Sequence, residues 1–433
     1  MKGTGEMGTS ASYSRRDVLR GAGAVALAGA LAACGSNSGR AGAGGISQWY
    51  HQYGEKGTQQ AAERFAKAYT KANVQIQWTP GDYSQKLATG LLSSSGPDVF
   101  ENQLNVDLVR AKQIVPLDDI FAAAKSDFVG PAVDANTYDG KLYAIPMIED
   151  MQLLFYRKSL LAKAGVQPPK SIPELIEAAK KLTNKTVKGL FVGNFSRTNG
   201  NSVLSALSVW PSGADFLTPD HKVGFHQPGV VQTLQQLRQL FSSGSLLLGA
   251  PTDWSDPSAF IQGLTAMQWS GIWAIPQIKA AFGDDFGVAP WPALTATGKP
   301  SVPIGTWGAM VSAKSKNVDA AKQFVKWLWI DQTDDQLEWA TKYGFHIPVR
   351  TSLLAKAAAL KSGIGADVAT FSQQYAKNST PPEWTPKMQS AYGDVVTQVV
   401  QNGGDAESHS SQGRRPGQRR TQTPLRLIGG RTP

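Results

Sequence analysis

Gly140-Lys141-Leu142-Tyr143-Ala144-Ile145-Pro146 follows the turn signal Asp139-Gly140, and the predicted fold is organised around this stretch and its continuation to Tyr156. An apolar strand that stops at Pro146 precedes the polar pair Glu149-Asp150. A second apolar strand, Leu153-Leu154-Phe155-Tyr156, comes after that pair. A polar elbow between two buried strands is expected where a chain leaves one sheet and enters another. The stretch therefore predicts the first crossing between two lobes.

The chain before this stretch alternates strand, helix, strand, helix and strand, with short connections. Strands are predicted at Ile46–Tyr50, Val74–Trp78 and Val99–Phe100, with helically spaced apolar residues between them. Such alternation is typical of a doubly wound α/β sheet, in which ligands bind beyond the carboxyl ends of the strands. Those ends are predicted at His51–Lys56, Gly81–Tyr83 and Glu101–Gln103.

A second lobe of the same class is predicted after the crossing. Ser171 caps a helix that runs to Leu182, and a buried strand follows at Leu190–Gly193. Val302–Val311 and Phe345–Arg350 are predicted as the second and third crossings. The predicted class is thus α/β, with two lobes that are each a doubly wound sheet flanked by helices, and three interlobe crossings. The N-terminal lobe is assigned residues 46–149 and 305–347, and the C-terminal lobe 150–304 and 348–407.

Length and composition fit two globular domains. The 433 residues exceed one ordinary core, and 41% are hydrophobic while 18% are charged. The net charge of +10 lies mainly at the ends, because residues 1–33 carry +2 and residues 408–433 carry +6. The remaining body is nearly neutral, so nucleic acid is not an expected partner. A single cysteine and five scattered histidines predict no disulfide, no metal site and no cofactor.

The two ends of the chain resemble export and tail sequences. Arg15-Arg16 precedes a short apolar run, which is similar to a twin-arginine export signal over residues 1–33. The run ends in Leu31-Ala32-Ala33-Cys34, which resembles a bacterial lipobox and makes Cys34 the candidate lipidation site. A buried structural thiol is the alternative for Cys34. Residues 34–45 are expected to be a flexible tether, and 408–433 a disordered basic tail or a product of a reading-frame change.

Several pieces of the chain, in order, resemble bacterial extracellular solute-binding proteins of the maltose-binding type (family 1), the sugar-binding lipoproteins of ABC importers. The pieces are Ser95–Phe100, Gly140–Gly165, Pro169–Leu175, Phe260–Trp273, Gly305–Trp307, Ser312–Leu328 and Tyr343–Arg350. The resemblance covers about residues 46–405 and implies the periplasmic-binding-protein fold with its ligand between two lobes. It also implies an exported monomer, lipid-anchored to the outer face of the cytoplasmic membrane, that delivers a sugar to ABC permease subunits.

A sugar site needs acceptors and donors for hydroxyl groups and aromatic plates for the apolar ring face. By position, the resemblance and the strand ends indicate a set of candidate contacts, with Trp273 and Trp307 as the stacking plates. His51 and His346 are expected mainly to hold structure by hydrogen bonds. The full candidate set is His51, Tyr53, Glu55, Lys56, Tyr83, Glu101, Asn102, Glu149, Asp150, Asn199, Asn201, Trp273, Gly305 and Trp307.

Each candidate also has a plainer interpretation. Trp307 could pack in the core, Glu101 and Glu149 could form ordinary ion pairs, and Glu55-Lys56 could begin a solvated helix. The same fold could bind a peptide, polyamine or phosphodiester, or signal through a membrane partner. A secreted glycosidase would need two carboxyl groups about 5–10 Å apart, drawn from Glu101, Glu149 and Asp150, but no hydrolase motif is present.

Overall fold

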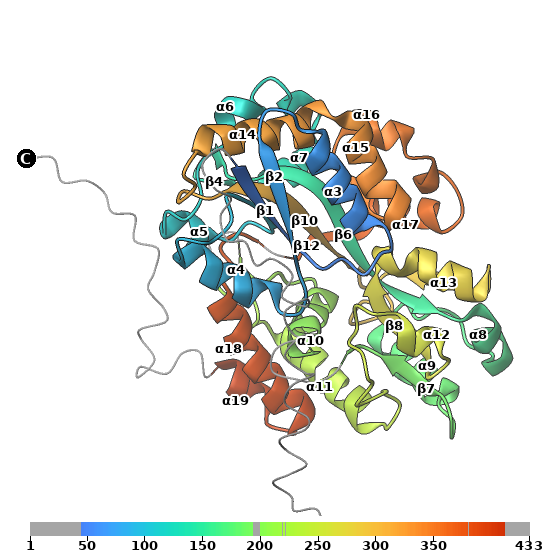
Figure 1. Cartoon of the computed structure of the whole chain (residues 1–433). Helices are drawn as coiled ribbons and strands as arrows, with labels where there is room; N and C mark the ends of the chain where they lie inside the picture. The colour runs from blue at the N-terminus through green and yellow to red at the C-terminus, as the bar shows by residue number, and fades with distance from the viewer. Residues whose placement is uncertain (1–44, 194–199, 219, 221, 380, 412–433) are drawn as a thin grey trace, which may run out of the picture.

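The computed structural model describes residues 45–193, 200–218, 220, 222–379 and 381–411. Its strands are β1 Gly45–His51, β2 Asn73–Thr79, β3 Val99–Asn102, β4 Thr137–Tyr138, β5 Lys141–Leu142, β6 Ile145–Tyr156, β7 Lys188–Phe191, β8 Thr265–Gly271, β9 Gly287–Ala289, β10 Val302–Val311, β11 Ile347–Pro348 and β12 Ala376–Asn378. Within the described residues, ten strands form one sheet in the order β2-β1-β3-β10-β6-β8-β7 (Figure 1). Strands β9 and β11 also pair with β6, and β12 pairs with β10.

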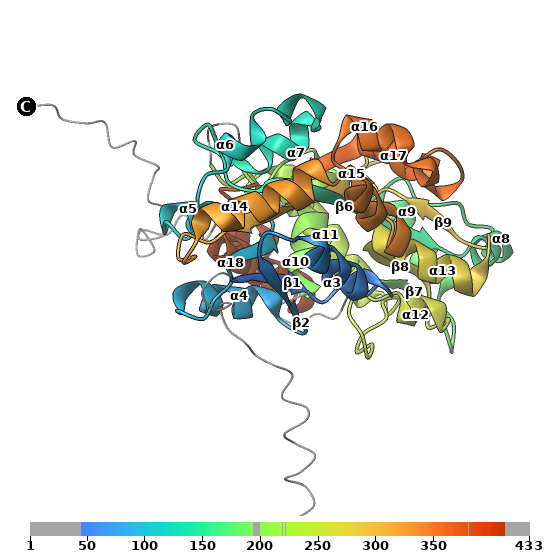
Figure 2. The same cartoon turned by 45° about the horizontal axis from the view of Figure 1, so that its top comes forward.

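Helices cover this sheet, and α14 runs across it in Figure 2. None of the helices in the described residues is long and apolar enough to span a bilayer. The α-helices are α3 Thr58–Ala68, α4 Tyr83–Leu92, α5 Val106–Arg110, α6 Asp118–Phe121, α7 Gly130–Asp134, α8 Lys158–Ala164, α9 Ile172–Leu182, α10 Gly200–Val209, α11 Pro228–Ser242, α12 Ser258–Ile261, α13 Ile275–Phe282, α14 Val318–Lys326, α15 Thr333–Glu338, α16 Thr351–Lys356, α17 Ile364–Tyr375, α18 Pro386–Val396 and α19 Ala406–Ser411.

Strand β6 is shared by the two halves of the sheet. Its residues 145–151 pair with β10 and β11, and its residues 152–156 pair with β8 and β9. The prediction of two strands separated by an elbow is therefore wrong, since β6 continues through Glu149-Asp150 without a break. Pro146 does not end the strand because the register shifts beside it: Pro146 pairs with Gly308 and Ile148 pairs with Trp307, so Met147 is an extra residue in β6.

The first half of the sheet is packed on both faces, as a doubly wound sheet requires. On one face, Ile46 and Tyr50 of β1 share a hydrophobic cluster with Phe65 of α3 and Phe324 of α14. The other face carries Phe100 of β3 and Met310 of β10, which pack with Leu87 and Leu91 of α4. Alternate residues of one strand thus enter opposite clusters, which explains the near-continuous apolar runs in the sequence.

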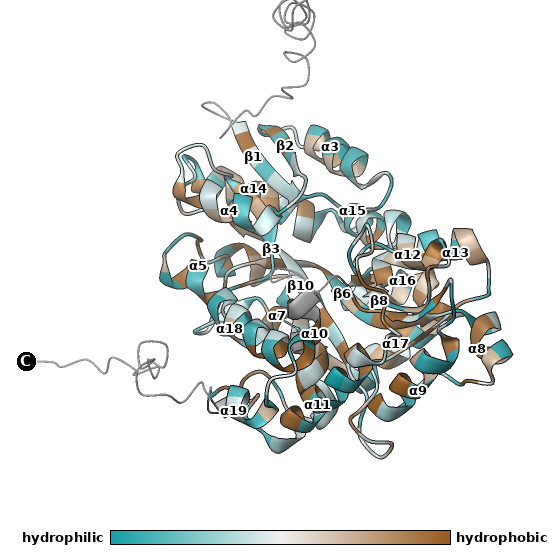
Figure 3. Cartoon of the chain, turned by 90° about the horizontal axis from the view of Figure 1, so that it is seen from below, coloured by the Kyte–Doolittle hydropathy of each residue, from teal (hydrophilic) through white to brown (hydrophobic). Residues whose placement is uncertain are grey.

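The second half follows the same rule. Leu154 of β6 and Trp269 of β8 pack with α9 and α11, whereas Leu153 and Phe155 pack with α13 on the opposite face. The surface helices show both hydrophilic and hydrophobic residues along their length in Figure 3, as expected of helices with one face on a core.

The turn before β5 and the end of the described chain both bear on predictions made from the sequence. Asp139 (φ 49°) and Gly140 (φ 71°) join β4 to β5 as a two-residue hairpin turn, so the predicted turn is confirmed. The tail was predicted from Ser408, but Ser408–Ser411 lie in α19, where Ser408 N–H donates to Asp405; residues 412–433 lie outside the described residues.

The predicted cap of α9 is confirmed and can be tested. Ser171 Oγ accepts a hydrogen bond from Glu174 N at 3.4 Å, and Glu174 Oε2 accepts one from Lys170 N at 2.8 Å. We expect Ser171→Ala to lower the free energy of unfolding by about 1 kcal/mol, since a helix N–H loses its acceptor. Urea unfolding measures this, with exposed Ser362→Ala as the control; equal stability of the two variants would contradict the cap's contribution.

Candidate ligand-binding site

Neighbouring strands bring most of the predicted site residues of the first half together. The order β1-β3-β10-β6 places the ends of β1 and β3 beside the middle of β10 and β6. Gly305 pairs with Asp150, Thr306 pairs with Glu149, and Asn102 pairs with Gly308. Residues that are distant in the sequence, such as Asn102 and Gly308, therefore lie side by side in the sheet.

Glu101 is the centre of the first group of contacts. Its Oε1 accepts hydrogen bonds from His51 N at 2.8 Å and His51 Nδ1 at 2.5 Å, and its Oε2 accepts one from Tyr53 OH at 2.6 Å. Tyr83 OH donates to the Glu101 carbonyl at 2.8 Å. The Glu101 side chain is 0% exposed and that of His51 is 24% exposed. Glu101 therefore holds the loop after β1 in place, while His51 stays accessible.

Aromatic rings pack against His51. The His51 ring lies 3.9 Å from the Tyr53 ring and is stacked on Trp307 at 4.5 Å, with an angle of 22° between the planes. Burial raises the pKa of Tyr53 well above its ordinary value, and the nearby Glu101 carboxylate raises it further. Tyr53 is therefore a neutral hydrogen-bond donor at physiological pH.

Asp150 joins the aromatic stack to a buried histidine. Its Oδ2 accepts a hydrogen bond from Trp307 Nε1 at 3.1 Å, and its Oδ1 bonds to His346 Nδ1. His346 Nε2 lies 3.1 Å from Glu55 Oε1. Burial alone would lower the pKa of His346, but the two carboxylates outweigh it and raise this pKa to about 10. His346 is thus an imidazolium between Glu55 and Asp150.

We refer to these residues as the polar cluster. It links the loop after β1, the end of β3, the middle of β6 and β10, and the residue before β11. Its members are His51, Tyr53, Glu55, Glu101, Asp150, Trp307 and His346.

Glu149 lies next to the polar cluster but on the other face of β6, because successive strand side chains alternate. It is 8% exposed, and Thr306 Oγ1 donates to its Oε1 at 3.4 Å. Burial is the main effect that raises the pKa of Glu149 to about 7, and the nearby Asp150 carboxylate raises it further. The hydrogen bond from Thr306 lowers this pKa but does not offset the burial. Glu149 therefore exchanges a proton near neutral pH.

Gly305 permits a close approach at the same edge. A Cβ atom at this position would lie 2.3 Å from Gln103 Nε2 and 3.0 Å from Ser379 Oγ. Ser379 is fixed by hydrogen bonds from its backbone N and its Oγ to the Ile304 carbonyl. Gln103 and Ser379 were not among the predicted contacts; Gln103 could have been found because it follows Glu101-Asn102 at the strand end.

The second half contributes a pair of tryptophans beyond the end of β8. Trp273 and Trp254 are both half-buried, and their rings lie 5.7 Å apart at 63°. Trp273 Nε1 donates to the Ser255 carbonyl at 2.9 Å. Its ring lies against Gly271, where a Cβ atom would come within 2.0 Å of the indole. Trp254 was not predicted, although a tryptophan between aspartate and serine in a loop is a usable signal.

The family model for bacterial extracellular solute-binding proteins matches residues 48–328, which is more than half of the chain. The chain belongs to this family. The matched region includes the strand residues His51, Glu101, Asp150 and Trp307. The solute-binding fold predicted from the sequence is confirmed, and the extracellular placement of the family agrees with the predicted export.

Curated relatives of this solute-binding protein differ in their ligands. A "Probable ABC transporter-binding protein" of Deinococcus radiodurans is 30% identical over 57% of the chain and 60% of its own length. A maltotriose-binding protein of Pyrococcus abyssi is 25% identical over 62% and 58%. An sn-glycerol-3-phosphate-binding periplasmic protein of Pectobacterium atrosepticum is 26% identical over 75% and 78%. The chain thus spans about three fifths of the first two relatives.

A solved structure agrees with this assignment. The GacH receptor of Streptomyces glaucescens, described unliganded and in complex with acarbose, matches with a TM-score of 0.71. The two chains are 25% identical, and the match covers 85% of this chain and 95% of the receptor. The predicted two-lobed α/β class is therefore confirmed.

The remaining predicted site residues of this solute-binding protein lie apart from the polar cluster. Lys56 is exposed, and Trp273 packs against the hydrophobic cluster of Leu153, Phe155 and Ile275. Asn199 lies outside the described residues, as does Cys34. Asn201 lies in α10, but its side chain is also outside what the structure describes. Ligand contact by these residues stays a prediction.

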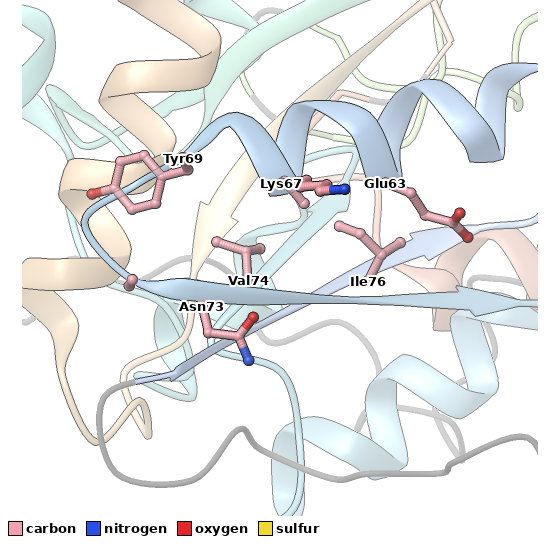
Figure 4. Close-up of a pocket in the computed structure, with 8 residues that line it drawn as sticks. Glu63, Lys67, Tyr69, Asn73, Val74 and Ile76 are labelled. Carbon is pink, nitrogen blue, oxygen red and sulfur yellow. The ribbon is translucent and has the colours of Figure 1, made fainter.

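Two surface hollows lie away from the predicted site. One, of about 410 Å³, lies between α3 and β2, where Glu63, Lys67, Asn73 and Ile76 are among the lining residues (Figure 4). The other, of about 460 Å³, lies beside the start of α17. Neither is lined by any of the predicted site residues.

Proposed function

We propose that this protein is the extracytoplasmic substrate-binding subunit of an ABC importer and captures a carbohydrate, an oligosaccharide, between its lobes. The observation that carries the proposal is the aromatic surface of accessible His51 stacked on the half-buried indole of Trp307, which the carboxylates of Glu101 and Asp150 hold in place. The apolar face of a sugar ring packs on an indole, and a fixed imidazole beside it can hydrogen-bond a sugar hydroxyl. The maltotriose-binding relative and the acarbose complex of the GacH receptor support the same ligand class.

The lobe division proposed for this function is 46–149 with 305–347, and 150–304 with 348–407. The polar cluster belongs to the first lobe and the crossing strands, and Trp254 and Trp273 belong to the second. A ligand that contacts both groups stabilises the closed arrangement because it binds that arrangement more tightly. The closed protein then docks on a membrane permease.

Isothermal titration calorimetry of the purified protein tests the carbohydrate proposal. The panel is maltotriose, diacetylchitobiose, acarbose, glucose and sn-glycerol 3-phosphate. We expect at least one saccharide to bind and to raise the melting temperature. Binding of none of the four saccharides would overturn the carbohydrate proposal.

A phosphate-bearing solute is the second candidate, because one relative is named for sn-glycerol 3-phosphate. The site chemistry disfavours it, since Glu55 and Asp150 lie on either side of His346, and Glu149 lies close to Asp150. Selective binding of glycerol phosphate in the panel would favour this candidate over carbohydrate.

We propose no catalytic activity. Glu101 accepts three hydrogen bonds from the end of β1 and the loop after it and is fully buried, and Asp150 is bonded to His346 and Trp307. Neither carboxyl is arranged as a free acid or base beside Glu149. Release of shorter saccharides during incubation with maltotriose would contradict this.

We also propose that Cys34 carries a lipid that anchors the protein to the outer face of the cytoplasmic membrane as a monomer. The support is the run Leu31-Ala32-Ala33-Cys34 after Arg15-Arg16. Mass spectrometry of the membrane-bound protein should show a diacylated N-terminal cysteine. Cys34→Ala should release the protein from membranes; retention of that variant would argue against the anchor.

Trp273 provides a test of the stacking role. We expect Trp273→Ala to weaken binding of the saccharide by about 1–3 kcal/mol, because an aromatic plate for the ring face is lost. Calorimetry measures the change, with half-buried Trp327→Ala beside α14 as the matched control. Unchanged affinity in Trp273→Ala would remove this residue from the site.

A further inference from the structure

The hydrogen bonds of His51 distinguish its two ring nitrogens. Nδ1 lies 2.5 Å from Glu101 Oε1, and the His51 backbone N–H donates to the same oxygen at 2.8 Å. For Nε2, the described part of the chain provides no hydrogen-bond partner. The side chain is 24% exposed, whereas Glu101 is fully buried. Nδ1 is thus hydrogen-bonded within the protein, and Nε2 is available to hydrogen-bond a ligand.

Glu101 determines which nitrogen carries the proton. Both of its carboxylate oxygens already accept hydrogen bonds, from His51 N–H and from Tyr53 OH. A carboxylate oxygen accepts, so Nδ1 must donate to it, and in the neutral imidazole Nε2 is then an acceptor. The available nitrogen therefore matches a ligand group that donates, such as a hydroxyl.

The ring is also fixed in orientation. It packs against Tyr53 at 3.9 Å and is stacked on Trp307 at 4.5 Å. Trp307 is itself held by the hydrogen bond from its Nε1 to Asp150. The ring that carries Nε2 is therefore fixed beside the indole on which a sugar ring would pack.

We propose that His51 is a specificity-determining residue, whose Nε2 accepts a hydrogen bond from one hydroxyl of the bound saccharide. Glu101 is the positioning residue that fixes the His51 tautomer. The proposal rests on the proposed carbohydrate function and narrows its ligand. The ligand must carry a free hydroxyl at that point, so a derivative with a methoxy or phosphate group there loses the interaction.

His51→Asn tests the proposal, because the asparagine amide reproduces Nδ1 and can still donate to Glu101, while Nε2 is removed. We expect this variant to remain folded, with a melting temperature lowered only by the lost ring packing, and to bind the panel saccharide about tenfold more weakly. His51→Phe is the complementary variant, since it keeps the ring against Trp307 and removes both nitrogens. We expect a comparable loss of affinity together with lower stability.

Mono-O-methyl derivatives of the same saccharide locate the hydroxyl. In the wild type, one derivative should bind about tenfold more weakly than its parent. In His51→Asn, that derivative and the parent should bind alike, since coupled groups are not additive. A full methylation effect at every position of the variant would overturn the proposal.

A measurement on the wild type avoids dependence on variant folding. Nitrogen-15 NMR of the His51 ring, assigned by its absence in His51→Asn, should show a proton on Nδ1 and none on Nε2. Addition of the saccharide should shift the Nε2 signal. A proton on Nε2, or no shift on binding, overturns the proposal.

The outcomes separate this proposal from the proposed function. If saccharide binds and His51→Asn binds it within twofold, the carbohydrate function stands and the role of His51 is overturned. If no saccharide in the panel binds, both fall, and the Nδ1 proton then reflects only the structural pair with Glu101.

Discussion

Replacing His346 with leucine should lower the free energy of unfolding by about 3–5 kcal/mol near neutral pH. The substitution leaves Glu55 and Asp150, whose side chains are 5% and 14% exposed, without the imidazolium between them. Two buried carboxylates then face each other with no positive partner. Urea unfolding followed by circular dichroism measures the change. A decrease in the free energy of unfolding of less than about 1 kcal/mol would show that the ion pairs of His346 contribute no more than a surface ion pair does.

The pH dependence gives His346 a second readout. Its pKa is raised from 6.5 to about 10, so the folded protein retains a proton that the unfolded chain releases. The stability from this proton is complete below pH 6.5 and is lost as pH rises towards about 10. The His346→Leu variant should show a flatter profile over this range. Lys342→Ala, which breaks an exposed pair with Glu338, is the control and should leave the profile unchanged.

Glu149→Gln should have the second largest effect. Burial raises the pKa of Glu149 from 4.5 to about 7, so the stability from its protonated form is complete below pH 4.5 and is lost as pH rises through 7. Glutamine keeps the shape without the ionisation. Between acidic and mildly alkaline pH, the free energy of unfolding of the wild type should fall by about 3 kcal/mol because Glu149 ionises. We expect no such fall in the variant.

Denaturant unfolding at several pH values measures the Glu149 effect, and the range 4.5–7 distinguishes it from that of His346. Glu177→Gln is the matched control, because that carboxylate is 63% exposed. Parallel profiles for the wild type and Glu149→Gln would show that Glu149 is ionised in the folded protein at an ordinary pH.

Local sequence patterns were sufficient to predict several strands and the positions where they end. The alternating and apolar runs predicted β1, β2, β3 and β10, because each strand buries both faces or one face in a regular way. Glu55, Glu101 and Asp150 could be selected because a carboxylate at the end or crossing point of a buried strand is unusual. The break predicted at Pro146 failed because the extra residue Met147 accommodates the proline within β6, and this follows only from the pairing with β10, far along the chain.

Partners distant in the chain could not be predicted. His346 was predicted to have a structural role, but nothing in the neighbouring sequence indicates that it lies between Glu55 and Asp150 in the fold. Glu101 was chosen as a ligand contact, whereas its side chain is buried and serves His51 and Tyr53. Trp254 was missed because its contact with Trp273 joins two segments that are separate in the sequence. In each case the missing information is which side chains meet across the sheet.

The place of β10 has a consequence for how the chain is made. Val302–Val311 lies between β3 and β6 in the sheet, although both of those strands leave the ribosome much earlier. Until this late segment has been synthesised, β3 and β6 have no β10 to pair with on their facing edges. Their backbone edges and apolar residues are therefore exposed during synthesis. The N-terminal portion of the nascent protein should therefore depend on chaperones until translation has passed Val311.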